Sequence, residues 1–216
     1  MKMIEYIVNN YPLILEKALE HVYLAGVAVL LACAVGIPVG FLITKNKKTA
    51  DIVIGVANII QTIPSLALFA FALPIFGIGA DNAIFALFLY ALLPIIKNTL
   101  IGIRNVNPAI REAAKGMGMS RSQIMFKVEI PLAISVIMGG VRIATVTGIG
   151  IATIATLIGA GGLGQLIYQG IGMWNTEMIY VGAICSALLA LLADFLLGLV
   201  EKKLTSPGIV KEDQLS

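Results

Sequence analysis

The chain reads EAAKGMGMSRSQIMFKVEIP over residues 112–131, a polar stretch in a protein that is otherwise strongly apolar. Of its 216 residues, 59% are hydrophobic and 12% are charged, whereas a soluble domain has roughly 25% charged residues. The composition therefore indicates an integral membrane protein. We expect the polar stretch to lie outside the bilayer, where it can contact a soluble partner.

Two short helices are predicted within this stretch. Glu112–Lys115 consists of strong helix formers. Gly118 permits a sharp turn, because glycine accepts a positive φ. Ser120 precedes Gln123 by three positions, which predicts a capping box at the start of the second helix. Pro131 is expected to open the next apolar segment, where its missing N–H is harmless.

We predict an all-α protein with five membrane spans, because about 20 apolar residues cross a bilayer. The spans are 22–44, 52–76, 83–96 (extended to 100 if the short third segment needs it), 131–158 and 178–200. The glycine-rich residues 159–173 leave two readings open. We favour an extracellular loop with a short helix over 163–170, and the alternative is a re-entrant segment that adds a sixth apolar element.

Lysine and arginine concentrate in alternate loops, at 45–48, 97–127 and 202–203. The positive-inside rule places these loops in the cytoplasm. The N-terminus then lies outside the cell and the C-terminus in the cytoplasm. The net charge of +3 is small and sits near the predicted membrane boundaries, so it indicates topology and not nucleic-acid binding.

The chain divides into three regions. Residues 1–21 mix charged and apolar side chains around Pro12, which predicts an amphipathic helix at the membrane surface. Residues 22–203 form the membrane domain, and the polar residues 204–216 are expected to be a mobile cytoplasmic tail. His21 has no other His or Cys nearby, so a surface or capping role is favoured and no metal site is predicted.

The stretch at 112–131 resembles the EAA loop of ABC importer permeases, on Glu112, Ala113, Ala114, Gly118 and Pro131. The resemblance implies the type I ABC importer permease fold, with residues 104–131 as a cytoplasmic coupling loop that docks on an ATPase. The residues that it assigns to coupling are Glu112, Ala113, Ala114, Gly118, Ser120, Arg121 and Pro131.

Three further stretches, QTIPSLAL at 61–68, PIFGIG at 74–79 and TLIGAGGLG at 156–164, resemble the osmoprotectant branch of these permeases. The resemblance implies import of glycine betaine, carnitine or choline. A methionine-type permease is the nearest alternative. An ion-coupled secondary carrier is a rival from another class, but it predicts an inverted repeat, and we find none that is convincing.

The resemblance also implies partners in a prokaryotic plasma (inner) membrane. These are a second permease subunit, identical or paralogous, two cytoplasmic ABC ATPase subunits and an extracytoplasmic solute-binding protein. The chain has no Walker-type phosphate-binding motif, so we expect it to bind no cofactor, with ATP and magnesium on the partner ATPase. With one His and no paired intramembrane carboxylates, it is expected to be a transport subunit and not an enzyme.

Polar residues within the spans are the candidates for a translocation pathway. Arg142 lies about 11 residues past Pro131, roughly 16 Å along a helix and thus near mid-bilayer. Either it is structural, satisfied by carbonyls or by Asp194, or it attracts the carboxylate of a betaine-like solute. Threonines can also bond their own helix backbone. The full candidate set is Asn58, Gln61, Thr62, Ser65, Arg142, Thr145, Thr153 and Thr156.

Overall fold

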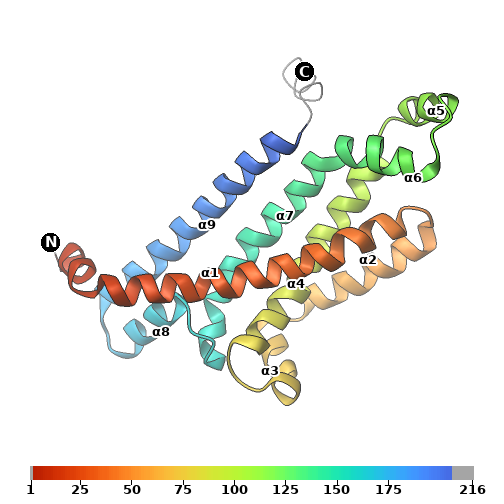
Figure 1. Cartoon of the computed structure of the whole chain (residues 1–216). Helices are drawn as coiled ribbons and strands as arrows, with labels where there is room; N and C mark the ends of the chain where they lie inside the picture. The colour runs from red at the N-terminus through yellow and green to blue at the C-terminus, as the bar shows by residue number, and fades with distance from the viewer. Residues whose placement is uncertain (1, 206–216) are drawn as a thin grey trace.

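The structure is a computed structural model that describes residues 2–205. Helices account for nearly all of those residues, and no strand is present among them. The elements in chain order are α1 (Lys2–Ile43), α2 (Lys47–Thr62), α3 (Ser65–Phe76), α4 (Ala80–Arg104), α5 (Pro108–Gly116), α6 (Arg121–Ile124), the π-helical turn η1 (Met125–Glu129), α7 (Ile130–Ala152), the 3₁₀ helix η2 (Ile154–Ile158), α8 (Gly164–Gly172) and α9 (Thr176–Leu204) (Figure 1).

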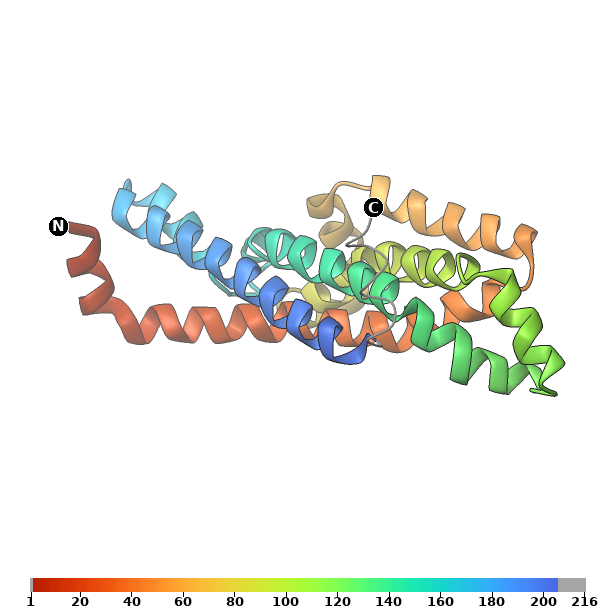
Figure 2. The same cartoon turned by 90° about the horizontal axis from the view of Figure 1, so that it is seen from above.

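α4 forms the centre of the bundle. α1 and α7 pack along it, and α2 and α3 cover its remaining sides. The main core cluster joins Leu24 of α1, Phe69 of α3, Leu87 of α4 and Ala155 of η2, all buried. α9 lies farther out, against α7 and α8 (Figure 2).

The described residues contain four helices that are long and apolar enough to cross a membrane, within 3–43, 80–104, 121–152 and 176–204. α2 and α3 pass the same test only as a pair that is bent by 99°. The prediction of five spans is confirmed if this pair is one span. α4 has 25 residues, so the third span is longer than predicted.

The predicted span over 52–76 is not one straight helix but the bent pair of α2 and α3. Ile63 is extended, with φ −70° and ψ 126°, and it separates α2 from α3. Pro64 is the physical reason, since it cannot donate a helical hydrogen bond and it disfavours helical geometry in the residue before it. The two helices pass the hydropathy test for a membrane span when taken together, so hydropathy alone does not reveal the break.

α1 is one continuous helix of 42 residues, including Pro12 and Pro38, so the predicted boundary between 1–21 and 22–44 is not a helix end. The N-terminal half packs on α8 and α9 through Leu13, Ile14 and Ala18, which sustains the helix through residue 21. The axis of a helix of this length is about 63 Å long, roughly twice the hydrocarbon core, and α1 bends near its N-terminal end (Figure 2). That residues 2–21 lie at the membrane surface stays a prediction.

The basic segments gather at one end of the bundle. α1 ends and α2 begins there, and α4 leads into α5 and α6 at the same end (Figure 1). α7 and α9 are antiparallel, because Arg142 contacts Asp194 while Ser135 contacts Glu201, so Lys202 and Lys203 also lie near this end. We call it the basic end (residues 44–47, 104–130 and 201–204).

The opposite end contains η2, α8 and the glycine-rich residues 159–173. The predicted short helix over 163–170 is confirmed as α8, which has nine residues and is too short to cross a bilayer. Of the predicted tail at 204–216, Leu204 ends α9 and residues 206–216 lie outside the described part of the chain.

Candidate functional site

The coupling segment, residues 104–131, folds into short helices capped by their own side chains. α5 begins after Asn107, whose side-chain oxygen accepts a hydrogen bond from the Ala109 N–H at 2.9 Å, and Pro108 occupies its first turn. Both features suit a helix start, where backbone donors have no helical partner. Gly118 then turns the chain with φ +79°, as its predicted role requires.

The predicted capping box at the start of α6 is confirmed. The Gln123 N–H donates to the Ser120 hydroxyl oxygen at 3.3 Å, and the Ser120 N–H donates to the Gln123 side-chain oxygen at 2.7 Å. Two backbone donors are thus satisfied within four residues. The capping box therefore fixes the point at which this helix begins outside the bundle.

α6 continues into α7 without a break, so that residues 121–152 form one helix of 32 residues. Pro131 lies in the first turn of α7, at the start of the apolar segment as predicted, although the π-turn η1 before it keeps the helix continuous. A proline ring presses on the carbonyl four residues earlier. The wider π-turn directly before Pro131 gives that contact room while the helix continues.

Arg111 ties the coupling segment to the bundle. Its Nε lies 2.7 Å from a carboxylate oxygen of Glu129 in η1, and its guanidinium also donates to the Ile103 carbonyl near the end of α4. These contacts join α5, η1 and α4. A displacement of α5 therefore acts directly on two membrane helices.

The structure brings the predicted coupling residues together at the basic end. Ala114 is buried, whereas Glu112, Ala113, Gly118, Ser120 and Arg121 are exposed. On α5 the exposed residues Ala109, Ala113 and Gly116 share one side, as their helical spacing requires. A surface of such small residues can be approached closely by another protein, and contact with an ATPase stays a prediction.

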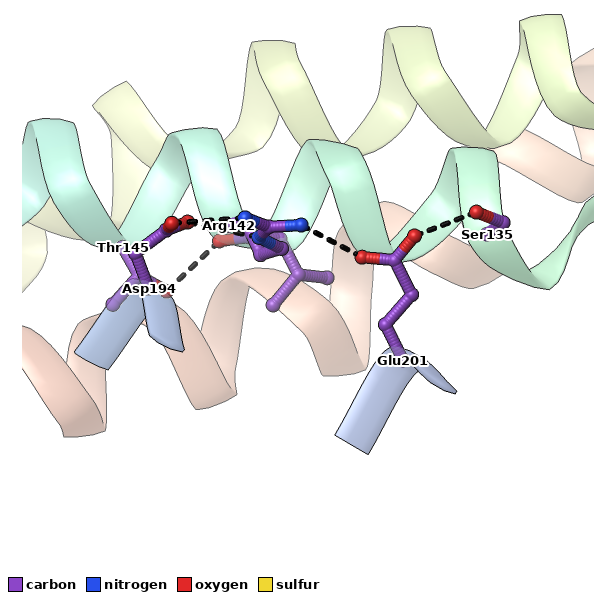
Figure 3. A network of polar contacts seen from close by, with 6 residues as sticks. Ser135, Arg142, Thr145, Asp194 and Glu201 are labelled. Atoms are coloured by element: carbon purple, nitrogen blue, oxygen red, sulfur yellow. Dashed lines mark hydrogen bonds and ion pairs between the residues drawn. The ribbon is translucent and has the colours of Figure 1, made fainter. Parts of the chain in front are cut away.

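A network of charged residues joins α7 to α9 (Figure 3). Arg142 donates from Nε and Nη2 to the two carboxylate oxygens of Asp194, both at 2.8 Å, and from Nη1 to Glu201 at 2.9 Å. Glu201 also accepts from the Ser135 hydroxyl at 2.6 Å. We call these four residues the α7–α9 clamp.

The clamp bears on both predicted roles of Arg142. The pairing with Asp194 is the structural alternative that the sequence left open. Three guanidinium nitrogens are already engaged with carboxylates, and a hollow of about 550 Å³ adjoins Arg142 and Asp194 between α7 and α9. Attraction of a solute carboxylate by Arg142 stays a prediction.

Sequence reasoning did not identify Glu201 or Ser135 as members of this network. The sequence did contain a signal for Glu201. It follows Asp194 by seven residues and thus lies on the same face of a helix. The basic pair Lys202 and Lys203 immediately after it suggested a membrane boundary instead. The network of carboxylates therefore extends farther along α9 than the sequence indicated.

The polar residues of α2 and α3 fix the bend between these helices. The Gln61 amide donates to the Tyr90 carbonyl at 3.0 Å, and the Tyr90 hydroxyl donates to the Ile63 carbonyl. Thr62 donates to its own helix at the Ile59 carbonyl. Asn58 is exposed, and Ser65 begins α3. Gln61 and Thr62 therefore have structural partners.

The candidate pathway residues do not form one cluster within this chain. Gln61 on α2 contacts α4, whereas Arg142 on α7 faces α9. Thr145 and Thr153 donate to carbonyls of their own helix, at 2.8 and 2.7 Å, and Thr156 lies in η2. Their role in translocation stays a prediction.

His21 is completely buried, so the surface alternative was wrong, whereas its ring does bind a backbone N–H at the start of α8. Its Nδ1 accepts from the Leu163 N–H at 3.2 Å, and its Nε2 lies 2.9 Å from the Ile149 carbonyl as the donor of that bond. Next to it, Glu20 accepts from the Gly162 N–H at 2.8 Å. Gly162 has φ +80°, so this loop needs glycine there.

The described residues contain no group of three His, Cys, Asp or Glu side chains that could hold a metal ion. Cys33 and Cys185 are both free thiols.

Comparison with known proteins agrees with this architecture. Residues 36–206 match the family described as the binding-protein-dependent transport system inner membrane component. The choline transport system permease protein OpuBB of Bacillus subtilis is 42% identical over 214 residues, covering 99% of both chains. The glycine betaine/carnitine/choline transport system permease protein OpuCB of the same organism is 43% identical over 208 residues, covering 96% of both.

A solved structure of the MetNI methionine ABC transporter in an inward-facing conformation contains a chain of the same fold. Its TM-score is 0.83 at 24% sequence identity, and the match covers 92% of this chain and 99% of that one. The predicted permease fold of an ABC importer is thereby confirmed. With a family match over most of its length and relatives above 40% identity along nearly all of it, the chain belongs to the binding-protein-dependent transport system inner membrane components, as a multi-pass permease.

Proposed function

We propose that this chain is the membrane subunit through which an ATP-driven importer moves osmoprotectants such as choline, carnitine and glycine betaine. The observation that carries the proposal is the 42–43% identity, along nearly the whole chain, to two permeases named for these solutes. The methionine alternative has weaker support, because the likeness to the MetNI chain is at 24% identity.

The three solutes share a quaternary ammonium group, which carries a positive charge but donates no hydrogen bond. Such a group needs a pathway of weakly polar surfaces and not strong donors. Exposed or half-exposed amide and hydroxyl side chains of Asn58, Ser65 and Thr156 suit this requirement. Arg142 then acts through the α7–α9 clamp to position α9.

The chain is proposed to work with three kinds of partner. A second permease subunit completes the pathway, two ATPase subunits supply ATP and magnesium chemistry at the basic end, and a separate solute-binding protein delivers the solute from outside. The exposed small-residue face of α5 supports an ATPase contact. The basic segments support a cytoplasmic basic end with the C-terminus inside and the N-terminus outside.

The experiment that tests the solute class is uptake by the reconstituted complex of this chain with its ATPase and binding protein. Vesicles loaded with ATP receive labelled choline, carnitine, glycine betaine and methionine in parallel. Uptake of at least one quaternary ammonium solute, with none of methionine, supports the proposal. Uptake of methionine alone would replace it with the alternative.

Coupling is tested with a charge reversal on α5. Glu112→Lys is expected to lower ATP-dependent uptake and copurification of the ATPase by about tenfold, since interface charge reversals cost several-fold to many-fold in affinity. Glu5→Lys is the matched control, because Glu5 is also exposed but lies near the start of α1, away from the basic end. Membrane insertion is expected to be normal in both variants. Equal ATPase recovery with the two variants would reject the coupling assignment.

A further inference from the structure

A basic hollow of about 440 Å³ lies at the basic end, where the ends of α1 and α4 meet the inner side of α5 and α6. Its charged lining consists of five cations and one anion, leaving a formal charge of +4. These residues, which define the basic hollow, are Lys45, Arg104, Arg111, Lys115, Arg121 and Glu129.

Most of this positive charge is not compensated. Glu129 is paired with Arg111 at 2.7 Å. None of the other four cations lies within ion-pair distance of a carboxylate in residues 2–205. Like charges around a concave surface repel one another and raise the local concentration of anions. The hollow therefore favours a ligand that carries negative charge.

The position of the hollow indicates which anion. Lys45 lies in the turn that follows α1, and Arg104 is the last residue of α4. Both helices are membrane spans, so these side chains lie where spans leave the hydrocarbon and where lipid phosphates are found. Ile103 and Ile124 add apolar wall beside the cations, which suits a molecule that is part headgroup and part glycerol.

The hollow and the proposed ATPase contact occupy different sides of α5. Arg111 and Lys115 are four residues apart and line the hollow together. Ala113 lies between them in sequence, so helical geometry turns it to the other side, where it is exposed. A ligand in the hollow can therefore be bound while an ATPase covers the small-residue face.

We propose that the basic hollow binds the phosphate of an anionic lipid headgroup. Basic pockets between membrane helices at the cytoplasmic side are suited to such headgroups, and guanidinium groups bind phosphate oxygens with well-matched geometry. Free inorganic phosphate shares this chemistry but would not use the apolar wall. The site does not depend on which solute the protein transports.

The test uses the full chain in nanodiscs that contain equal amounts of phosphatidylglycerol and phosphatidylcholine. Native mass spectrometry counts the lipids that the protein retains on release. The test variant is Lys45→Gln/Arg104→Gln, which removes two charges from the hollow. The matched control is Lys202→Gln/Lys203→Gln, which removes two charges from the same end outside it. Circular dichroism and gel filtration confirm that both are folded.

The wild type and the control are expected to retain phosphatidylglycerol in preference to phosphatidylcholine. In the test variant the ratio of retained phosphatidylglycerol to phosphatidylcholine is expected to fall about tenfold. Lys45→Arg/Arg104→Lys, which keeps both charges, is expected to restore it. Displacement of the lipid by excess inorganic phosphate would show that the hollow binds anions but prefers free phosphate. That result would overturn the assignment to a lipid. Equal retention by both double-Gln variants, whether high or low, would overturn the site itself.

Discussion

α4 and α9 are both long apolar helices, yet they occupy opposite environments. In the most apolar part of α4, 56% of the residues are buried inside the protein, against 6% in α9. α4 is surrounded by α1, α2, α3 and α7, whereas α9 rests on α7, α8 and part of α1. Leu188, Leu191 and Phe195 remain exposed along α9.

The difference shows what holds a helix in a membrane protein. Apolar side chains gain little by leaving lipid for protein, so packing and polar contacts decide where a helix sits. α4 is held by close packing, with Gly140 of α7 directly against Pro94 and Asn98. α9 is held at one end by the α7–α9 clamp and at the other by close contact with α8.

The largest difference in unfolding free energy is expected between two leucine truncations, one in α4 and one in α9. Leu87→Ala in α4 leaves a cavity among buried residues and should cost about 2–4 kcal/mol of unfolding free energy, because Leu87 is 1% exposed. Leu191→Ala in α9, where the side chain is 67% exposed, should cost less than about 0.5 kcal/mol. Unfolding by a denaturing detergent measures both. A similar loss from Leu191→Ala would mean that another subunit covers this part of α9.

Adding one methyl group to a glycine of α7 tests the packing around α4. A Cβ on Gly140 would lie 2.6 Å from the Asn98 Cβ and 2.7 Å from the Pro94 carbonyl oxygen. Gly140→Ala should therefore cost about 1–3 kcal/mol through overpacking. A Cβ on the adjacent Gly139 meets nothing within 4 Å, so Gly139→Ala is the control. Equal thermal stability of the two variants in detergent would contradict the close α4–α7 contact.

The clamp predicts a ranking of charge-removing variants. Arg142→Gln leaves two carboxylates without their counter-charge, whereas Asp194→Asn leaves Arg142 paired with Glu201. The side chains are about a third exposed, so we expect about 1–2 kcal/mol for Arg142→Gln and less for Asp194→Asn. Detergent unfolding gives the ranking, and equal losses would show that the contact between Arg142 and Glu201 contributes nothing.

The same variant separates the two roles of Arg142. If the residue only positions α9, Arg142→Gln lowers uptake of choline and of glycine betaine by the same factor. If it attracts the solute carboxylate, glycine betaine uptake falls further than that of choline, which has no carboxylate. The ratio of the two uptake rates is the measurement, and it is insensitive to the amount of folded protein.

The smallest change in stability is expected from adding a methyl group to a glycine at either end of α9. A Cβ on Gly182 would lie 2.8 Å from Ile167 and 3.0 Å from Leu166, both in α8. Gly182→Ala should cost at least about 1 kcal/mol through overpacking, because the Leu166 Cβ and the Ile167 backbone nitrogen, at 3.1 Å, cannot move aside by a change of rotamer. A Cβ on Gly198 meets the Arg142 guanidinium at an ordinary 3.6 Å, so Gly198→Ala should be neutral. Stability loss at Gly198 instead would show that α9 is tightly packed along its whole length.

Local features were predictable from the sequence. Ser120 and Gln123 form their capping box within four residues, and Gly118 adopts its positive φ in an exposed turn, so neither depends on distant contacts. The number of apolar segments was predictable for the same reason. The coupling segment was therefore recognisable before its structure was known.

Features that depend on distant contacts were not predictable. His21 is buried by Leu163 and Ile149, more than 100 residues away, and a lone histidine gives no hint of such partners. The bend at Pro64 is similarly ambiguous, because Pro38 and Pro94 lie inside helices that continue. Pro64 makes the bend possible, and the contacts that Gln61 and Ile63 make with Tyr90 across the fold decide that the chain bends there.

The uninterrupted helix from Arg121 to Ala152 has a mechanical consequence. At 1.5 Å per residue it is about 48 Å long. The π-turn η1 and Pro131 lie between its exposed tip and the part at membrane depth, and helices bend at such places. Any displacement of the tip that is not absorbed by bending there would reach Arg142, and the α7–α9 clamp would then move α7 and α9 together.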